Sequence, residues 1–177
     1  KWGEVNPSSS TTELNYYIYD DEITLEGFSS GALLDEEETA FLQAMEDYSS
    51  VANISFTESS NFEDAHILWA SLNDENSEGD LGFAYSPESG AYDGLTTLNY
   101  EAYSTNDQID DEDILLPGSI YYTVFNHELG HALGLSHPHS DDFEIESFPG
   151  VSIDGDTGDN GLNAQPYTVM TYNLSLI

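Results

Sequence analysis

The feature that most restricts the fold of this 177-residue chain is a run of histidines that begins at His127. The run has the form H-E-x-x-H-x-x-G-x-x-H, so His127 and His131 are four residues apart. On an α-helix this spacing puts both side chains on one face, one turn apart, where two imidazoles can share a metal ion. Gly134 can adopt a positive φ, which would end the helix and let the chain turn back so that His137 supplies a third nitrogen. The motif therefore predicts a helix that ends within it and a metal site of three imidazoles.

The predicted ligand set indicates the chemistry of the site. Three neutral imidazoles with one open position are typical of a catalytic zinc site, whereas magnesium and calcium prefer oxygen ligands. Glu128 is placed to accept a proton from a zinc-activated water, so the sequence predicts hydrolysis of peptide bonds without a covalent intermediate. The alternative is a histidine cluster that holds a surface metal or none, but it leaves Glu128 and Gly134 unexplained.

The rest of the chain predicts a mixed sheet with two main helices. Alternating or continuous apolar segments indicate strands, and helical spacing behind capping residues indicates helices. We expect a helix over 35–50, with Asp35 and Glu38 as its capping box, and a second helix from Ser119 to about Leu133. The predicted strands are 14–19, 53–57, 65–70, 95–100 and a short edge strand near 83–85. Because we find no internal repeat, no linker and no helix pattern after Leu135, we expect one α/β domain over residues 1–177.

The charge of the chain excludes several partners. Asp and Glu number 35 against a single basic residue, Lys1, and the formal net charge is -34. No cationic surface is available for phosphates or anionic lipids, so nucleic-acid and membrane binding are excluded. Aromatic residues make up 12% of the chain and lie in periodic segments, which favours a folded core over disorder. We expect the acidic shell to need a saline or calcium-rich environment.

The histidine motif, followed by Val169-Met170-Thr171-Tyr172, resembles the metzincin clan of zinc endopeptidases. Pro138 after the third histidine and the Met-x-Tyr spacing resemble the serralysins within that clan. The resemblance implies an α/β (α+β-like) metzincin fold: a twisted mixed sheet, a zinc-binding active-site helix and an irregular C-terminal part with a Met-turn. It also implies that Met170 forms an apolar floor beneath the imidazoles. Tyr172 would be a further zinc ligand that donates a hydrogen bond to the oxyanion during turnover, with an ordinary packed or exposed tyrosine as the alternative.

The resemblance extends to the substrate and to the location of the enzyme. The stretch Gly82-Phe83-Ala84-Tyr85 resembles the edge strand that pairs with an extended peptide, which implies substrate binding by Gly82, Ala84 and Tyr85. An edge strand without this role is the alternative. Since serralysins are secreted bacterial proteases, we expect an extracellular monomer that acts on proteins or peptides. The rival hypothesis is a non-catalytic acidic domain that binds cations or partners and keeps zinc as a structural element.

Three further features give weaker predictions. His66 lies in an apolar segment and is expected to be a core histidine with its hydrogen bonds satisfied. His139 is expected to be exposed to solvent and not to bind zinc. The loop 154–161 has the composition of a calcium site, but Gly158 stands where the EF-hand pattern needs an oxygen ligand and Gln165 where it needs a bidentate Glu. A calcium site of another geometry is therefore the alternative to a plain acidic turn.

Overall fold

The computed structural model describes residues 11–19, 24–25, 28–31, 33–72, 80–87, 90, 92–99, 115–139 and 146–173. They belong to two compact units, Lys1–Leu133 and Gly134–Ile177. The first unit contains the sheet and the helices, whereas the described residues of the second contain neither helix nor strand. The expected absence of a helix after Leu135 is thus confirmed for the described residues, and one domain over 1–177 stays a prediction.

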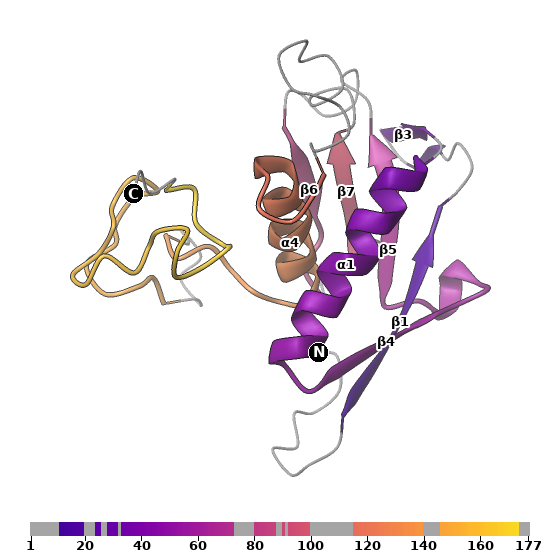
Figure 1. The fold of residues 1–177 in the computed structure, drawn as a ribbon, viewed down its shortest axis with the longest axis horizontal. Coiled ribbons are helices and arrows are strands. Elements are labelled where there is room, and N and C mark those ends of the chain that lie inside the picture. Colours follow the sequence, from indigo (N-terminus) through magenta and orange to yellow (C-terminus); the bar gives the residue numbers. More distant parts are fainter. Residues whose placement is uncertain are drawn as a thin grey trace. The chain divides into compact units, whose positions relative to one another are not determined.

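Five strands of the first unit lie in the order β4-β1-β5-β7-β6 (Figure 1). The first four are parallel, and β6 pairs antiparallel with β7. This confirms the predicted mixed sheet and its short edge strand. The bounds are Thr12–Ile18 for β1, Ile54–Glu58 for β4, Ile67–Leu72 for β5, Gly82–Ala84 for β6 and Leu95–Asn99 for β7.

Three short elements were not predicted from the sequence. Strand β3 (Phe28–Gly31) pairs antiparallel with the end of β5 and with β2 (Thr24–Leu25). The 3-10 helix η1 (Phe62–Asp64) begins after Asn61, whose side chain accepts the N–H of Glu63. Elements this short span too few residues to show a readable periodicity.

Helix α1 (Asp35–Val51) confirms the predicted first helix, but the predicted capping box is wrong by one residue. Leu34 is the N-cap, and its N–H donates to the carboxylate of Glu37 at 2.9 Å. Glu37 is completely buried and also accepts the hydroxyl of Ser71 on β5 at 3.0 Å. The helix therefore begins where its third residue can reach both the N-cap and the sheet, which the sequence spacing alone does not reveal.

Helix α4 (Ile120–Ala132) confirms the predicted second helix and its cap. The hydroxyl of Ser119 accepts the N–H of Tyr122 at 3.0 Å, satisfying one of the unpaired donors of the first turn. After the helix, Gly134 has a φ of +92°, the left-handed conformation expected at this end.

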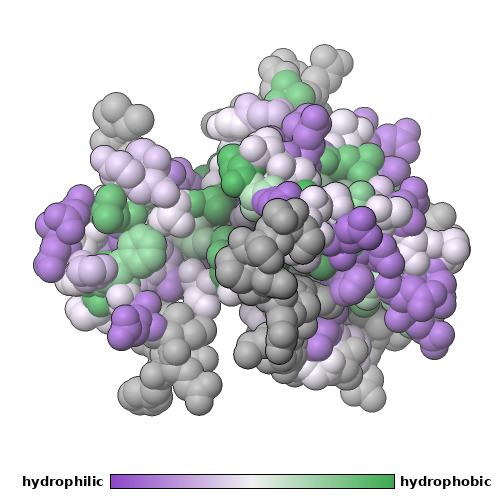
Figure 2. All heavy atoms as spheres, turned by 90° about the horizontal axis from the view of Figure 1, so that it is seen from below, coloured by the Kyte–Doolittle hydropathy of each residue, from purple (hydrophilic) through white to green (hydrophobic). Residues whose placement is uncertain are grey.

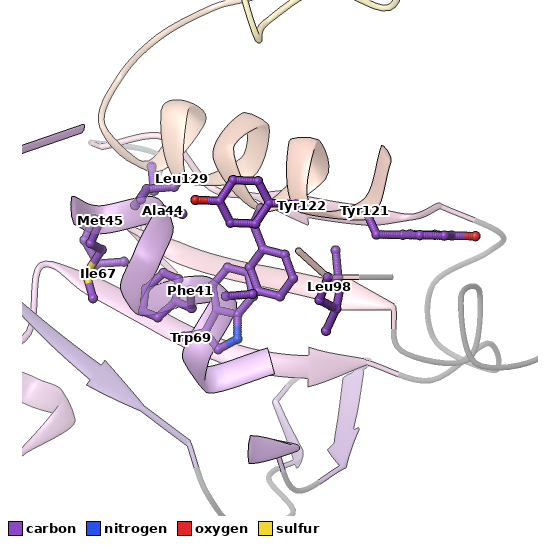
Figure 3. Close-up of a cluster of buried hydrophobic side chains, with 13 residues drawn as sticks. Phe41, Ala44, Met45, Ile67, Trp69, Leu98, Tyr121, Tyr122 and Leu129 are labelled. Carbon is purple, nitrogen blue, oxygen red and sulfur yellow. The ribbon is translucent and has the colours of Figure 1, made fainter. Parts of the chain in front are cut away.

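An aromatic stack joins both helices to the sheet. Trp69 on β5 lies between Phe41 of α1 and Phe125 of α4, with ring centroids 4.3 Å and 4.8 Å away and nearly parallel planes. All three side chains are completely buried, and Figure 3 shows the tryptophan packed among its apolar neighbours. Burial of this size contributes several kcal/mol, roughly 1.5–3 per large side chain, and fixes α4 against the sheet.

Two tyrosine hydroxyls also link the helices. Tyr48 of α1 donates to the main-chain oxygen of Asn126 at 2.8 Å, and Tyr122 of α4 donates to Asp47 at 2.6 Å. Burial raises the pKa of both tyrosines, and for Tyr122 the hydrogen bond to Asp47 adds to this effect. The segment of α4 that carries the histidines is thus held by α1 on one side and by the sheet on the other.

The surface is hydrophilic over much of its visible area (Figure 2). The exposed acidic side chains of helix α1 are Asp35, Glu36, Glu38, Glu46 and Asp47. Glu37 is the buried exception among the acidic residues of this helix. Among the described residues, no helix combines the length and the hydropathy that a membrane crossing needs.

Candidate metal and catalytic centre

The last turns of α4 bring two predicted ligands together. Nε2 of His131 lies 3.1 Å from Nε2 of His127, and the two rings are nearly perpendicular, at 82°. His127 is buried and His131 is half-buried. Two imidazole nitrogens this close on one helix face can coordinate a common cation. The arrangement is the one that a four-residue spacing predicts.

Glu128 follows the first of these histidines and is almost completely buried, with 7% of its surface exposed. Burial raises the pKa of its carboxyl to about 8, and the negative charge of Asp80 adds to the increase. A carboxylate with a raised pKa binds a proton more tightly than an ordinary one, which suits a group that accepts and returns a proton. The sequence predicted this residue but not the influence of Asp80.

The edge strand β6 lies directly beside Glu128. A Cβ placed on Gly82 would be 3.1 Å from Cγ of Glu128, 3.2 Å from Cγ1 of Val124 and 2.6 Å from the main-chain oxygen of Thr97. The contact therefore depends on the absence of a side chain at position 82. No sequence pattern predicts this contact, because the strand and the helix are brought together only by the tertiary fold.

The main-chain N–H and C=O groups of β6 point alternately toward β7 and away from it. Asn99 donates to the oxygen of Leu81, and Tyr85 exchanges hydrogen bonds with Leu95 and Gly94, so the odd-numbered positions face β7. In an antiparallel pair the intervening positions point away from the partner strand. The main-chain groups of Gly82 and Ala84 therefore face outward, as substrate pairing would require. The main chain of Tyr85 is already occupied, which leaves only its side chain for the predicted role.

The second unit carries the remaining predicted site residues. The ring of His137 stacks on His139 with a centroid distance of 4.9 Å and an interplanar angle of 7°, and Tyr172 lies 4.6 Å from His137. Met170 is buried and Tyr172 is exposed over 55% of its surface. His139 is half-buried, so the expectation that it is a solvent-exposed side chain is only partly met.

Amide side chains hold this unit together. The side chain of Asn163, which is completely buried, donates to the main-chain oxygen of Asp156 at 2.6 Å and accepts the hydroxyl of Thr171. The amide of Asn173 donates to the main-chain oxygens of Asp154 at 2.9 Å and Asn163 at 2.9 Å. These bonds connect the loop 154–156 to the segment that contains Met170 and Tyr172.

The acidic loop makes local turns. The carboxylate of Asp156 accepts the hydroxyl and the N–H of Ser152 and the N–H of Ile153, and these hydrogen bonds lower its pKa. Asp154 accepts the N–H of Gly155. Both carboxylates thus have partners within the loop, and a calcium ion there stays a prediction.

Outside the motif, His66 precedes β5 and is half-buried. Its Nδ1 accepts the N–H of Asn15 at 2.9 Å, so the prediction that its hydrogen-bonding capacity is satisfied is confirmed for this nitrogen.

Among the described residues, one group of at least three histidine, cysteine or acidic side chains could hold a metal ion, with two members on α4 and one in the second unit. Its members are His127, His131 and His137.

Comparisons with known proteins identify the family of the chain. The family profile described as Peptidase_M10, Matrixin, matches residues 10–145. The serralysin of Photorhabdus sp. (strain Az29) is 34% identical over 146 residues, which cover 78% of this chain and 28% of the relative. The metallopeptidase AprA of Pseudomonas marginalis is 35% identical over 100 residues, covering 54% of this chain and 19% of the relative. The chain thus spans less than a third of the length of these relatives. The match to the solved structure of myroilysin covers 80% of this chain and 55% of the myroilysin chain, with 16% sequence identity and a TM-score of 0.46.

Proposed function

We propose that this chain, which belongs to the matrixin family of peptidases, is a zinc endopeptidase of the serralysin type that hydrolyses proteins or peptides. The observation that carries the proposal is the last part of α4, where two imidazole nitrogens lie 3.1 Å apart and the residue after the first histidine, Glu128, is a buried acid. Helix α4 thus carries two of the three proposed metal ligands together with the proposed proton acceptor.

The donor set fits zinc. His127, His131 and His137 supply nitrogen, which suits a borderline-soft cation, and the group contains no carboxylate that would favour a harder one. We propose Tyr172, whose ring lies beside His137, as an additional ligand. When bound, zinc would act as a Lewis acid that polarises the scissile carbonyl and activates water.

Glu128 is the proposed general base. It would accept a proton from the attacking water and later pass it to the leaving amine, so that the peptide bond breaks without a covalent link to the protein. Its burial excludes bulk water and raises its pKa, and a positive charge beside it would favour the ionised form that accepts the proton.

The substrate is proposed to bind as an added strand. The outward-facing main-chain groups of Gly82 and Ala84 would pair with an extended peptide, and the side chain of Tyr85 would contact it. Tyr172 would donate a hydrogen bond to the oxyanion that forms, and Met170 would form an apolar floor beneath the imidazoles. We further propose that the enzyme is an extracellular monomer, as the serralysins it resembles imply. It would have no nucleic-acid or membrane partner, because its net charge is strongly negative.

The test is zinc content together with hydrolysis of a denatured protein, compared between the wild type, Glu128→Ala and Glu46→Ala. Glu46 is an exposed glutamate of α1 and controls for the loss of one negative charge. We expect all three proteins to bind one zinc ion per chain and Glu128→Ala alone to lose activity, by about 100-fold or more. A zinc-loaded wild type without hydrolysis would favour the non-catalytic acidic domain, and full activity of Glu128→Ala would refute its role as the base.

A further inference from the structure

An exposed carboxylate lies just before the edge strand β6 in the sequence. Asp80 lies two residues before Gly82, and its side chain is exposed. Its main-chain oxygen accepts the side-chain amide of Asn99 at 3.2 Å, while the N–H of Asn99 donates to Leu81 at 2.9 Å. Asn99 is completely buried at the end of β7, so Asp80 is anchored to the sheet through its main chain while its side chain remains free to face solvent.

The position of Asp80 couples it to the catalytic helix. Gly82 packs directly against Glu128, with only 3.1 Å between Cγ of the glutamate and a Cβ placed on the glycine. Asp80 is thus two residues from the point where strand and helix touch. A ligand that lies along the outer edge of β6 would therefore pass close to Asp80.

Among the described residues there is no lysine or arginine that could pair with Asp80. The single basic residue of the chain is Lys1, which lies outside the described residues. The formal net charge of -34 adds a long-range attraction for cations that salt can screen. A cationic side chain of a ligand would therefore meet no competing lysine or arginine among the described residues.

We propose that Asp80 makes this site prefer substrates with a lysine or arginine in the segment that pairs with the start of β6. The inference rests on the proposed function and adds a substrate class to it. A peptide that pairs with the outward main-chain groups of Gly82 extends past the carboxylate of Asp80, where a cationic side chain forms an ion pair and an acidic one is repelled. For an exposed pair the expected preference is about threefold to fivefold in kcat/KM.

The test uses peptides that share one cleavable core. One position at a time, from three residues before the scissile bond to three after it, carries Lys, Gln or Glu. We measure kcat/KM for the zinc-loaded wild type, for Asp80→Asn and for Glu36→Gln, at fixed salt. Glu36 is an exposed carboxylate in the first turn of α1 and serves as the matched change in charge.

In the wild type we expect Lys to be favoured over Gln by about threefold to fivefold at one or two adjacent positions, and Glu to be disfavoured. Asp80→Asn should bring the Lys-to-Gln ratio close to one, whereas Glu36→Gln should leave it unchanged, and molar salt should reduce the wild-type ratio. An equal ratio in the wild type and Asp80→Asn overturns the inference. If the Gln peptides themselves are not cleaved, the proposed function fails instead. Circular dichroism of Asp80→Asn confirms that the comparison is made on a folded protein.

Discussion

Replacement of Gly82 by alanine should lower both the stability and the activity of the enzyme. The new Cβ would lie 2.6 Å from the main-chain oxygen of Thr97, too close for any real Cβ, and 3.1 Å from Cγ of Glu128. Because the closest atom belongs to a strand, the relief must come from a shift of β6, of β7 or of helix α4. Overpacking of this kind costs about 1–3 kcal/mol. For a chain of this size the melting temperature should fall by roughly 2–4 °C per kcal/mol.

The expected loss of activity follows from the same contact. A shift that relieves the clash moves either Glu128 or the main chain proposed to pair with the substrate. Misplacement of a reacting group by about 1 Å can cost about 100-fold in rate, so a fall in kcat of at least tenfold is expected. Thermal unfolding followed by circular dichroism, and kcat and KM on a neutral peptide, measure the two effects separately.

Gly155→Ala is the matched control. A Cβ on Gly155 meets no atom within 4 Å, and its φ is not in the left-handed region. This variant should keep full activity and should be as stable as the wild type or slightly more stable, because alanine restricts the unfolded chain. If Gly82→Ala melts within 1 °C of the wild type and keeps its kcat, the role assigned to the missing side chain is wrong.

Three further predictions concern the core, the pH dependence and the salt dependence. Phe125→Ala should lower the free energy of unfolding by about 3–5 kcal/mol in urea titrations, because it leaves a cavity beside Trp69. Tyr48→Phe and Tyr122→Phe should each cost about 1 kcal/mol, because each loses a hydrogen bond between the helices. Because the pKa of both tyrosines is raised in the folded protein, the unfolded chain loses the two phenolic protons at a lower pH, near 10. The free energy of unfolding should therefore fall as the pH rises past 10, and it should fall less in the double Phe variant. The melting temperature should rise from low to molar salt as the net charge of -34 is screened; a flat or falling curve would contradict this.

Much of the fold follows from periodicity. The four parallel strands and both long helices have apolar residues at a period that only one kind of element can bury, and all were predicted within a few residues. The start of α1 was not, because the choice between Glu37 and Glu38 depends on Ser71, a distant residue of β5. Local sequence gives the helix, but a long-range contact sets its first residue.

The candidate site divides in the same way. The spacing of His127 and His131 reports directly on a helix face, so their proximity could be predicted. The contact of Gly82 with Glu128 and the influence of Asp80 could not, because they depend on where an antiparallel edge strand meets a helix more than 40 residues later. Such neighbours are absent from any local pattern.

The hydrogen bonds made by the side-chain amides of the second unit have a consequence for the chemical ageing of the protein. Deamidation of Asn163 or Asn173 would convert an NH2 donor into a carboxylate that points at main-chain oxygens, with almost no change in shape. Acceptors would then face acceptors in the loop that supports Met170 and Tyr172. Slow hydrolysis of these two amides during storage should therefore loosen this part of the protein while the sheet and its helices stay intact.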